Sequence, residues 1–156
     1  MRVEQIMNRD VKTCASNAPA DRAARIMWES DIGAIPVTDA SGRVISMVTD
    51  RDLCMACLTQ SRALHEFPVS VAAVRKAITI GPNDTIQAAE DLMRQHQIRR
   101  LPVCERDGRI VGILSLNDLA RQTSRRGEVS SDEVARTLEA ISTSSRPSTT
   151  TQAQPS

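Results

Sequence analysis

Hydrophobic and polar residues alternate with different periods along this chain, and the second half shows the changes most clearly. A β-branched run at 77–80 predicts a short strand, and the turn that follows it carries Asp84, which can cap a helix. Apolar residues then recur every three or four positions, which is the spacing of one helical face. This pattern predicts a helix over 85–97.

Two further apolar runs predict a β-hairpin, with strands at 100–105 and 110–115 joined by the turn sequence RDGR. The first strand contains Pro102, which cannot donate a ladder hydrogen bond and therefore favours a strand edge or start. Another helix is predicted from residue 116.

The first half of the chain repeats this order. It predicts a helix at 20–30, strands at 34–39 and 44–49 around a turn, and a helix at 50–58. Shifted by 66 positions, the sequence matches itself without a gap from Val3/Val69 to Leu53/Leu119, with 13 identities in 51 aligned positions. Unrelated segments would share roughly three or four. The chain is therefore an internal repeat of two β-α-β-β-α units.

Each unit has a small sheet with two helices on one face, so the other face needs a covering layer, which the other unit can supply. The expected fold class is α+β, an α/β sandwich of two repeats with pseudo-twofold symmetry. The predicted divisions are 1–62 for the first repeat (core 8–58), 63–124 for the second (core 69–122), 125–142 for a C-terminal amphipathic helix and 143–156 for a disordered tail. The C-terminal helix can pack on the repeats or cross to a partner.

Composition narrows the possible functions. Trp28 and Phe67 are the only aromatic residues, which argues against a stacking platform for single-stranded nucleic acid, and a net charge of +1 gives no general attraction to nucleic acid or anionic membranes. No apolar run is long enough to cross a bilayer, and the N-terminus lacks the apolar stretch of a signal peptide. We predict a cytoplasmic protein whose four cysteines are free thiols.

Two blocks of sequence carry a resemblance, IGAIPVTDASGRVISMVTDRDL and IRRLPVCERDGRIVGILSLNDL. Over about residues 1–124 the chain resembles a tandem pair of CBS (cystathionine-β-synthase-type) domains, most closely the short stand-alone bacterial proteins that include the hypoxic-response type. The resemblance implies two clefts between the repeats, a disc-like homodimer of four repeats, and an adenosine-containing ligand: AMP, ADP, ATP, S-adenosylmethionine or NAD(H). It implies a regulatory module that requires no cofactor and acts on a protein that the sequence does not name.

A hydroxyl and an aspartate follow the last strand of each repeat, as Ser115/Asp118 and Thr49/Asp52. In the family this pair forms the ribose end of a cleft, and the helix N-terminus beside it favours phosphate. The same spacing is also that of a helix-capping box, and the hydroxyl can fill both roles.

The resemblance assigns residues to each cleft. The better-supported cleft takes Val11, Lys12, Ile32, Gly33, Arg100, Ile113, Ser115, Asn117 and Asp118; the second takes Ala77, Ile78, Ile98, Arg99, Thr49, Arg51 and Asp52. Arg100 is expected to bind phosphate, with a solvated surface arginine as the alternative. The second cleft is ranked lower because Ser46 replaces the glycine found at Gly112 and could narrow the space for the base or sugar.

Other candidate chemistry is weaker. Cys54 and Cys57 form a C-x-x-C pair that could bind zinc or carry redox chemistry, but on a helix this spacing more often reflects core packing. The carboxylates Asp50 and Asp52 have no nucleophile, phosphate loop or metal set to complete an active site, so no catalysis is predicted. The predicted function is a non-catalytic adenosine-ligand sensor. The alternative is a structural or protein-interaction module with empty clefts.

Overall fold

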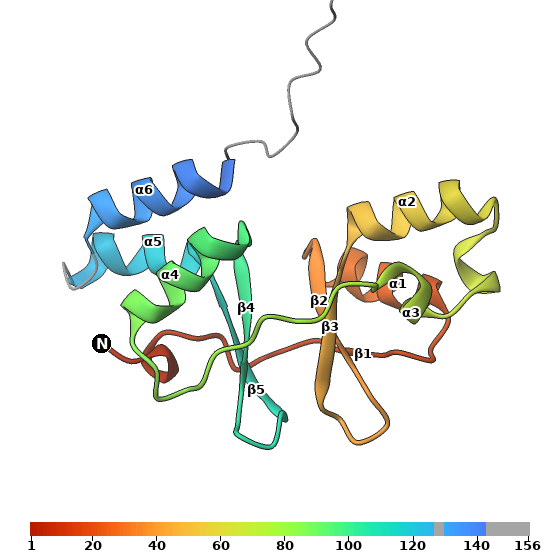
Figure 1. Ribbon diagram of the computed structural model, residues 1–156, viewed down its shortest axis with the longest axis horizontal. Helices are drawn as coiled ribbons and strands as arrows, with labels where there is room; N and C mark the ends of the chain where they lie inside the picture. The colour runs from red at the N-terminus through yellow and green to blue at the C-terminus, as the bar shows by residue number, and fades with distance from the viewer. Residues whose placement is uncertain (127–129, 143–156) are drawn as a thin grey trace, which may run out of the picture.

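The computed structural model describes residues 1–126 and 130–142, and Figure 1 shows two lobes that correspond to the two repeats. The first lobe contains β1 (Cys14–Ala15), α1 (Ala20–Glu29), β2 (Ala34–Thr38), β3 (Val44–Thr49), α2 (Asp50–Gln60), η2 (Leu64–Glu66) and α3 (Val69–Ala72). The second contains η1 (Val3–Gln5), α4 (Ile86–His96), β4 (Arg100–Cys104), β5 (Ile110–Ser115), α5 (Leu116–Arg126) and α6 (Ser131–Ser142). The predicted α+β class is confirmed, and the predicted strands 44–49 and 110–115 agree with β3 and β5.

The two sheets share one design. In the first, β1 runs parallel to β2, and β2 pairs antiparallel with β3. In the second, β4 and β5 form the same antiparallel hairpin. Both hairpins turn at a glycine with positive φ, Gly42 (76°) and Gly108 (86°), a conformation that L side chains disfavour.

The prediction of a strand at 77–80 is wrong for most of this segment. Only Ile80 joins the second sheet, through a parallel bridge to Val103. The residues before it pair with the other repeat. Lys76 forms an antiparallel bridge to Ser46, and the Ala77 N–H donates to the Ile45 carbonyl at 3.1 Å. The segment is therefore extended, but it crosses between two sheets instead of lengthening one.

Helices α1 and α4 bury equivalent faces. Ala20, Ala23 and Met27 are buried on α1, whereas α4 buries Ile86, Ala89, Glu90 and Met93. Small residues at the positions nearest the sheet let each helix approach it closely, and the methionine fills the remaining space. Two separate hydrophobic cores result, one in each lobe.

Each core is completed by a segment from the other repeat. The segment that precedes the first repeat packs in the second lobe, and the segment that precedes the second repeat packs in the first lobe. Val3 donates its N–H to Asp84 O at 2.9 Å in the second lobe. Its equivalent, Val69, donates to Ala18 O at 2.8 Å in the first lobe. The next pair matches as well, since Glu4 donates to Pro82 O and Ser70 donates to Ser16 O. Each lobe thus receives the same backbone contacts from a segment that leads into the other lobe.

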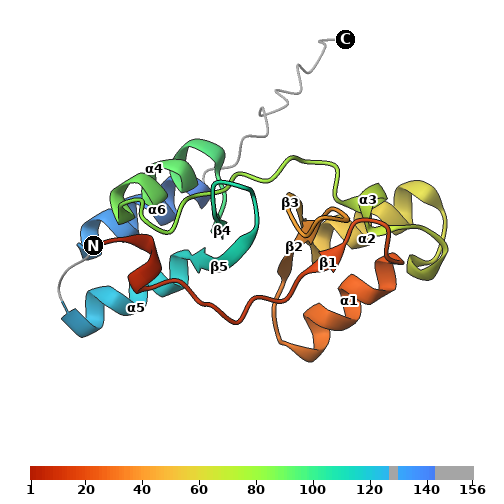
Figure 2. The same ribbon diagram turned by 90° about the horizontal axis from the view of Figure 1, so that it is seen from below.

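The side chains of the exchanged segments are part of the cores. Val3 and Met7 are buried in the core of the second lobe. Phe67, Val69 and Ala72 are buried in the core of the first. Figures 1 and 2 show the two passes between the lobes, the N-terminal segment in one direction and the segment after α3 in the other. Two crossings of the chain hold the lobes together.

The exchange explains the serine–glycine difference between the repeats and corrects our reason for it. The Ser46 hydroxyl lies 2.6 Å from Arg75 O and 3.0 Å from Ala73 O, in the crossing segment, and Ser46 is buried. At Gly112 a Cβ atom would lie 2.5 Å from Met7 Sδ. Both positions therefore face a crossing segment, so Ser46 is not evidence of a narrowed ligand space.

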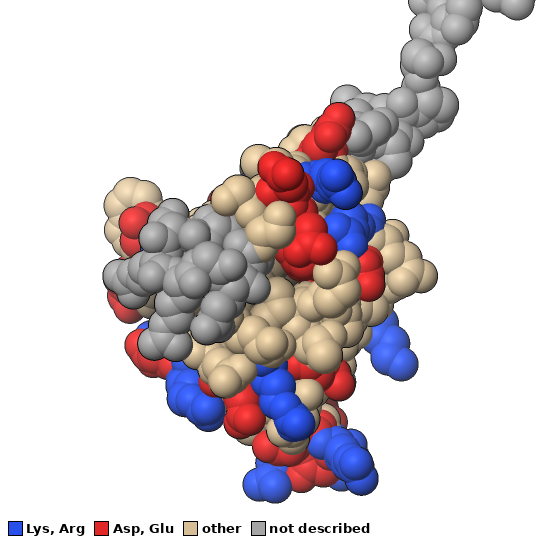
Figure 3. Space-filling view, turned by 90° about the vertical axis from the view of Figure 1, so that its left-hand side faces the viewer, with Lys and Arg blue, Asp and Glu red and all other residues tan. Residues whose placement is uncertain are grey.

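Helix α6 packs against α4 and α5 of its own chain, which is the first of the two arrangements predicted for it. Val134 and Ile141 pack against the core of the second lobe, and the Arg94 Nη1 donates to Thr137 Oγ1 at 3.2 Å. Figure 3, which shows this side of the molecule, has acidic and basic side chains interspersed around neutral surface. The predicted tail at 143–156 lies outside the described residues.

Candidate functional site

The hydroxyl–aspartate pairs lie where the last strand of each repeat enters a helix. In the second repeat, Asp118 Oδ2 accepts hydrogen bonds from the Ser115 N–H at 2.9 Å and the Ser115 hydroxyl at 2.5 Å, and the Asp118 N–H donates back to Ser115 Oγ at 3.2 Å. Thr49 and Asp52 form the same capping box at the start of α2. The capping role is therefore present at both sites, and it holds each aspartate at the head of a helix.

The cation expected at the better-supported cleft lies beside this pair. Arg100 is the ladder partner of Ser115 in the β4–β5 hairpin, and directly opposed residues project to the same face of a sheet with Cβ atoms about 5 Å apart. Arg100 is partly exposed. At the equivalent position of the first repeat, Ala34 opposes Thr49 and is buried. At this ladder position the site in the second repeat therefore has a guanidinium group that the site in the first repeat lacks.

The N-terminal segment approaches the same place. Asn8 and Ile113 exchange both backbone hydrogen bonds at 2.9 Å, which adds the segment to the free edge of β5. Val11 and Lys12 follow three and four residues later, and the Lys12 ammonium pairs with Asp10 at 2.9 Å on an exposed surface. The structure thus brings Arg100, Ile113 and Ser115 together. Because the Asn8–Ile113 bridge is antiparallel, the chain after Asn8 runs toward the start of β5, and among the described contacts none joins Val11 or Lys12 to Ser115.

Three other residues predicted for this cleft, Ile32, Gly33 and Asn117, lie outside the β4–β5 hairpin. Ile32 and Gly33 are beside Asp50 of their own repeat, where the Asp50 N–H donates to Gly33 O at 3.2 Å. Asn117 is exposed in the first turn of α5. Among the described contacts, none joins Ile32 or Gly33 to Ser115, so their assignment stays a prediction.

The residues predicted for the second cleft are also divided between the two lobes. Ala77 is held against β3 by its bond to Ile45, while Ile78 and Ile98 pack against the core of the second lobe. Arg99 is exposed, and its carbonyl accepts from the Leu116 N–H at 2.9 Å. Arg51 is exposed at the start of α2, beside Thr49 and Asp52.

The sequence analysis missed one cation. The Arg121 Nη1 lies 3.8 Å from Asp118 Oδ1, one helical turn away on α5. The spacing of three residues between Asp118 and Arg121 was the available signal. At the matching position of the first repeat the residue is Met55, so Arg121 is a second charge difference between the sites.

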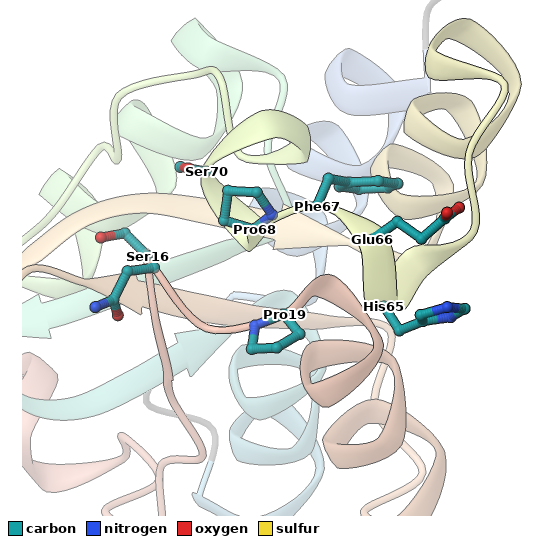
Figure 4. Close-up of a pocket in the computed structure, with 8 residues that line it drawn as sticks. Ser16, Pro19, His65, Glu66, Phe67, Pro68 and Ser70 are labelled. Atoms are coloured by element: carbon teal, nitrogen blue, oxygen red, sulfur yellow. The ribbon is translucent and has the colours of Figure 1, made fainter.

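The described part of the chain also contains a surface hollow that no prediction covered. It measures about 490 Å³ and lies between the N-terminal end of α1 and the η2–α3 segment. In Figure 4 its walls are formed by Ser16, Pro19, His65, Glu66, Phe67, Pro68 and Ser70. It is open to solvent, and none of the cleft residues named above lines it.

The cysteines are free thiols, as predicted. Burial raises the pKa of Cys104 to about 11 and raises the pKa of Cys14, so neither is an activated nucleophile. The core-packing interpretation of the C-x-x-C pair is wrong for Cys54, which is exposed on α2, while Cys57 is half-buried. Within residues 1–126 and 130–142, three or more His, Cys, Asp or Glu side chains nowhere cluster as a metal site, and no described helix could span a membrane.

Comparisons with known proteins agree with the repeat and its geometry. The sequence model of the CBS domain matches residues 3–59 and 69–124. The chain belongs to the CBS domain family. Proteins built from these domains are generally regulatory and non-catalytic.

Individual relatives have similar lengths. The CBS domain-containing protein YhcV of Bacillus subtilis is 37% identical over 118 residues, which is 76% of this chain and 82% of YhcV. Hypoxic response protein 1 of Mycobacterium tuberculosis is 33% identical over 116 residues, covering 74% of this chain and 80% of that protein. The crystal structure of the CBS domain protein PAE2072 from Pyrobaculum aerophilum, complexed with AMP, superposes with a TM-score of 0.72 at 24% identity, over 83% of this chain and 98% of that one. These relatives place the chain among CBS-pair proteins.

Proposed function

We propose that this CBS pair is a non-catalytic regulatory module that binds an adenosine-containing ligand, such as AMP, ADP, ATP, NAD(H) or S-adenosylmethionine, at Ser115 and Asp118. The observation that carries the proposal is the position of Arg100, opposite Ser115 in the hairpin and beside the N-terminus of α5. A guanidinium and free helical N–H groups are suited to phosphate. That PAE2072 holds AMP supports the ligand class.

The aspartate has a defined task in this proposal. Its Oδ2 atom is engaged by Ser115, whereas Oδ1 faces Arg121 at 3.8 Å. A carboxylate oxygen held in this way can accept hydrogen bonds from ribose hydroxyls without breaking the cap. Arg121 and Arg100 then supply positive charge around the ligand, which compensates the charge of a phosphorylated adenosine.

The experiment is isothermal titration of the full chain with AMP, ATP, NADH and S-adenosylmethionine. We expect Asp118→Ala to weaken binding about 10- to 100-fold, because hydrogen bonds to a charged group contribute about 1.5–3 kcal/mol. Asp52→Ala removes the matching cap in the first repeat and is the control for lost helix capping; we expect it to weaken binding less. Absence of binding at millimolar ligand would contradict the proposal, and equal losses would contradict the ranking of the two sites.

Two finer predictions accompany this proposal. We expect a cytoplasmic protein, and we expect it to self-associate, as the resemblance implies. Ligand in the clefts would act on the angle between the lobes or between two copies, and it can do so only through its difference in affinity for the two arrangements. A nucleotide that co-purifies with the protein, identified by mass spectrometry, would name the ligand.

A further inference from the structure

Helix α6 rests on a polar layer of α4 that the first repeat lacks. It lies over α4 and α5 on the outer side of the second lobe (Figure 1). The core residues Ala89 and Met93 of α4 are identical to Ala23 and Met27 of α1 at the 66-residue shift. The polar residues of α4 next to α6 all differ from their equivalents in α1: Gln87/Asp21, Glu90/Ala24, Asp91/Arg25 and Arg94/Trp28. The layer is therefore a feature of the contact with α6 and not of the repeat.

Hydrogen bonds join this polar layer to α6. Arg94 Nη1 donates to Thr137 Oγ1 at 3.2 Å, and the Thr137 hydroxyl donates to Glu133 O at 2.9 Å. The Gln87 amide, turned to suit both neighbours, donates to Glu133 Oε1 and accepts from Arg94 Nη2, each at 3.1 Å. Arg94 also pairs with Asp91 on its own helix. Thr137 is completely buried, so the contact excludes water there.

Glu90 is buried within the layer without a full set of partners. It is 1% exposed, and no group in the described part of the chain forms a hydrogen bond with its Oε1 atom. The charged groups that act on it are Asp91 and Arg94 of its own helix and Glu133 of α6; among the described residues of α5 and of the sheet there is none. Two of these three groups are acidic. An ionised carboxylate is therefore unfavourable at this position, whereas a protonated one is tolerated.

Helix α6 is the element that can move to let water reach an ionised Glu90. Helix α4 buries Ile86, Ala89 and Met93 in the core of the second lobe, so its displacement would open that core. Every residue of α6 is described, and only Thr137 is buried, while Val134 and Ile141 are partly buried. An element held by few buried side chains opens at the lowest free energy.

We propose that α6 is a proton-sensitive strap, which closes over α4 while the Glu90 carboxyl is protonated and opens when that carboxyl ionises. The O–H bond of the carboxyl breaks on opening and its proton passes to water, so the step needs no other reactant. In the open state Glu90 is hydrated, and the like charges of Glu90 and Glu133 move apart. The proton thus acts as a ligand of the closed state.

Opening changes the surface of the second lobe. It uncovers the outer sides of α4 and α5 together with Val134 and Ile141 of α6. Helix α5 begins directly after Ser115 and holds Asp118 in its first turn, so it is also the helix that carries the proposed ligand site. The inference does not depend on whether a ligand binds there.

The direction of the pH effect follows from the same groups. Burial first, and then the charge of Glu133, raises the pKa of Glu90 in the closed state, and opening removes both causes. Closure is therefore most stable below 4.5, the ordinary pKa of the carboxyl, and weakens as the pH rises through the raised value.

Hydrogen exchange of the full chain tests the strap, with protection factors corrected for the intrinsic exchange rate at each pH. We expect the protection of amides in α6 to fall at least tenfold from about pH 5 to about pH 8, while that of β5 changes less than about threefold. In Glu90→Gln the protection of α6 should be the same at both pH values. No fall in α6, or an equal fall in β5, would overturn the proposal.

Further variants separate the charge of Glu90 from other effects of pH. Glu90→Ala introduces the residue that the first repeat has at Ala24 and should also abolish the fall. Glu133→Gln keeps the oxygen that Gln87 contacts and should reduce the fall without abolishing it, because burial is the larger cause. Glu29→Gln, at an exposed position of α1, is the matched control and should leave the fall unchanged. A fall that persists in both Glu90 variants, or that disappears in Glu29→Gln, contradicts the assignment to Glu90.

Discussion

Ser46 and Gly112 meet the same requirement with different side chains. Each lies in the middle of a strand at the point where a crossing segment passes closest. In the first repeat the serine hydroxyl bonds to the carbonyls of the crossing segment, whereas in the second the sulfur of Met7 takes the space that a Cβ would need. Sequence comparison of the repeats found the difference but gave it the wrong cause, because the crossing segments come from the opposite repeat.

Gly112→Ala should destabilise the protein, because the new methyl group would lie 2.5 Å from Met7 Sδ and 3.2 Å from the Asn8 carbonyl. Overpacking of this kind costs about 1–3 kcal/mol of the free energy of unfolding, measured by urea denaturation. Ser46→Ala is the control at the equivalent position; it keeps the Cβ and should cost about 1 kcal/mol for the lost hydrogen bonds. An unchanged stability of Gly112→Ala would show that the crossing segment moves aside easily.

Glu90 gives the stability a pH dependence. It is 1% exposed under α6, and none of the described groups forms a hydrogen bond with its Oε1 atom. Burial first, and then the charge of Glu133, raises the pKa of this carboxyl, which Asp91 also raises and Arg94 lowers. The folded protein therefore keeps a proton that the unfolded chain releases, and stability falls as pH rises from about 4.5 through the raised pKa.

Glu90→Gln should remove this loss. We expect the variant to be more stable than the original protein at neutral pH, by about 1 kcal/mol, and to show little difference below the ordinary pKa of a glutamate. Thermal unfolding at several pH values measures both limits. A stability difference that stays constant with pH would mean that Glu90 does not titrate in this range.

At the scale of elements, most helices and strands were predictable because each is short, periodic and present twice. The hairpin strands, the turn glycines and helices α1, α2, α4, α5 and α6 follow from local pattern and agree with the structure, whereas the short helix α3 was not predicted. Two features were not predictable. Residues 76–77 pair with β3 instead of extending their own sheet, and Val3 and Val69 each pack in the opposite lobe. Identical residues at equivalent positions of the two repeats, such as Val3 and Val69, show that their surroundings are alike. They do not show which lobe each residue packs in.

Part of the candidate site could be predicted from the sequence and part could not. The spacing of Ser115 and Asp118 identified the strand–helix junction, and the hairpin register that opposes Arg100 to Ser115 follows from the turn. Arg121 was missed because a charge one turn along a helix looks like an ordinary surface residue. The ligand that fills the cleft depends on side chains from both repeats, and their relative placement is not a local property of the sequence.

Segment exchange predicts that core substitutions act across the molecule. Val3→Ala should lower the protection of backbone amides in α4 and β5 of the second lobe, since Val3 is fully buried there. Val69→Ala is the matched change and should affect α1 and β2 of the first lobe. Each should cost about 2 kcal/mol by hydrogen exchange, and losses confined to the lobe nearest in sequence would contradict the exchange.

The element α6 allows a similar comparison. Val134 packs against the core of the second lobe, whereas Leu138 on the same helix is 48% exposed. Val134→Asp should therefore lower the free energy of unfolding by about 1–3 kcal/mol, and Leu138→Asp should change it by less than about 0.5 kcal/mol. Urea denaturation measures both. Equal effects would show that α6 does not use this face.

On the scale of the whole molecule, the exchange determines which piece of chain can fold alone. A fragment of residues 9–74 contains the strands and helices of the first lobe together with Phe67, Val69 and Ala72, which complete its core. A fragment of residues 1–62 has nearly the same length but lacks those three side chains and carries an N-terminal segment that has no core to enter. We expect circular dichroism to show a cooperative unfolding transition for 9–74 and none for 1–62. Similar transitions would mean that the exchanged side chains contribute little.

The exchange also sets an order of events during synthesis. Val3 leaves the ribosome long before β5 and α5, which contribute to the core that buries it. At about 5–20 residues per second the delay is on the order of ten seconds. The first lobe, by contrast, can close as soon as residue 72 emerges. The apolar side chains of Val3 and Met7 therefore remain without their core through most of the synthesis of the two repeats, and a bulky group attached directly before Val3 would impede their entry into the second lobe.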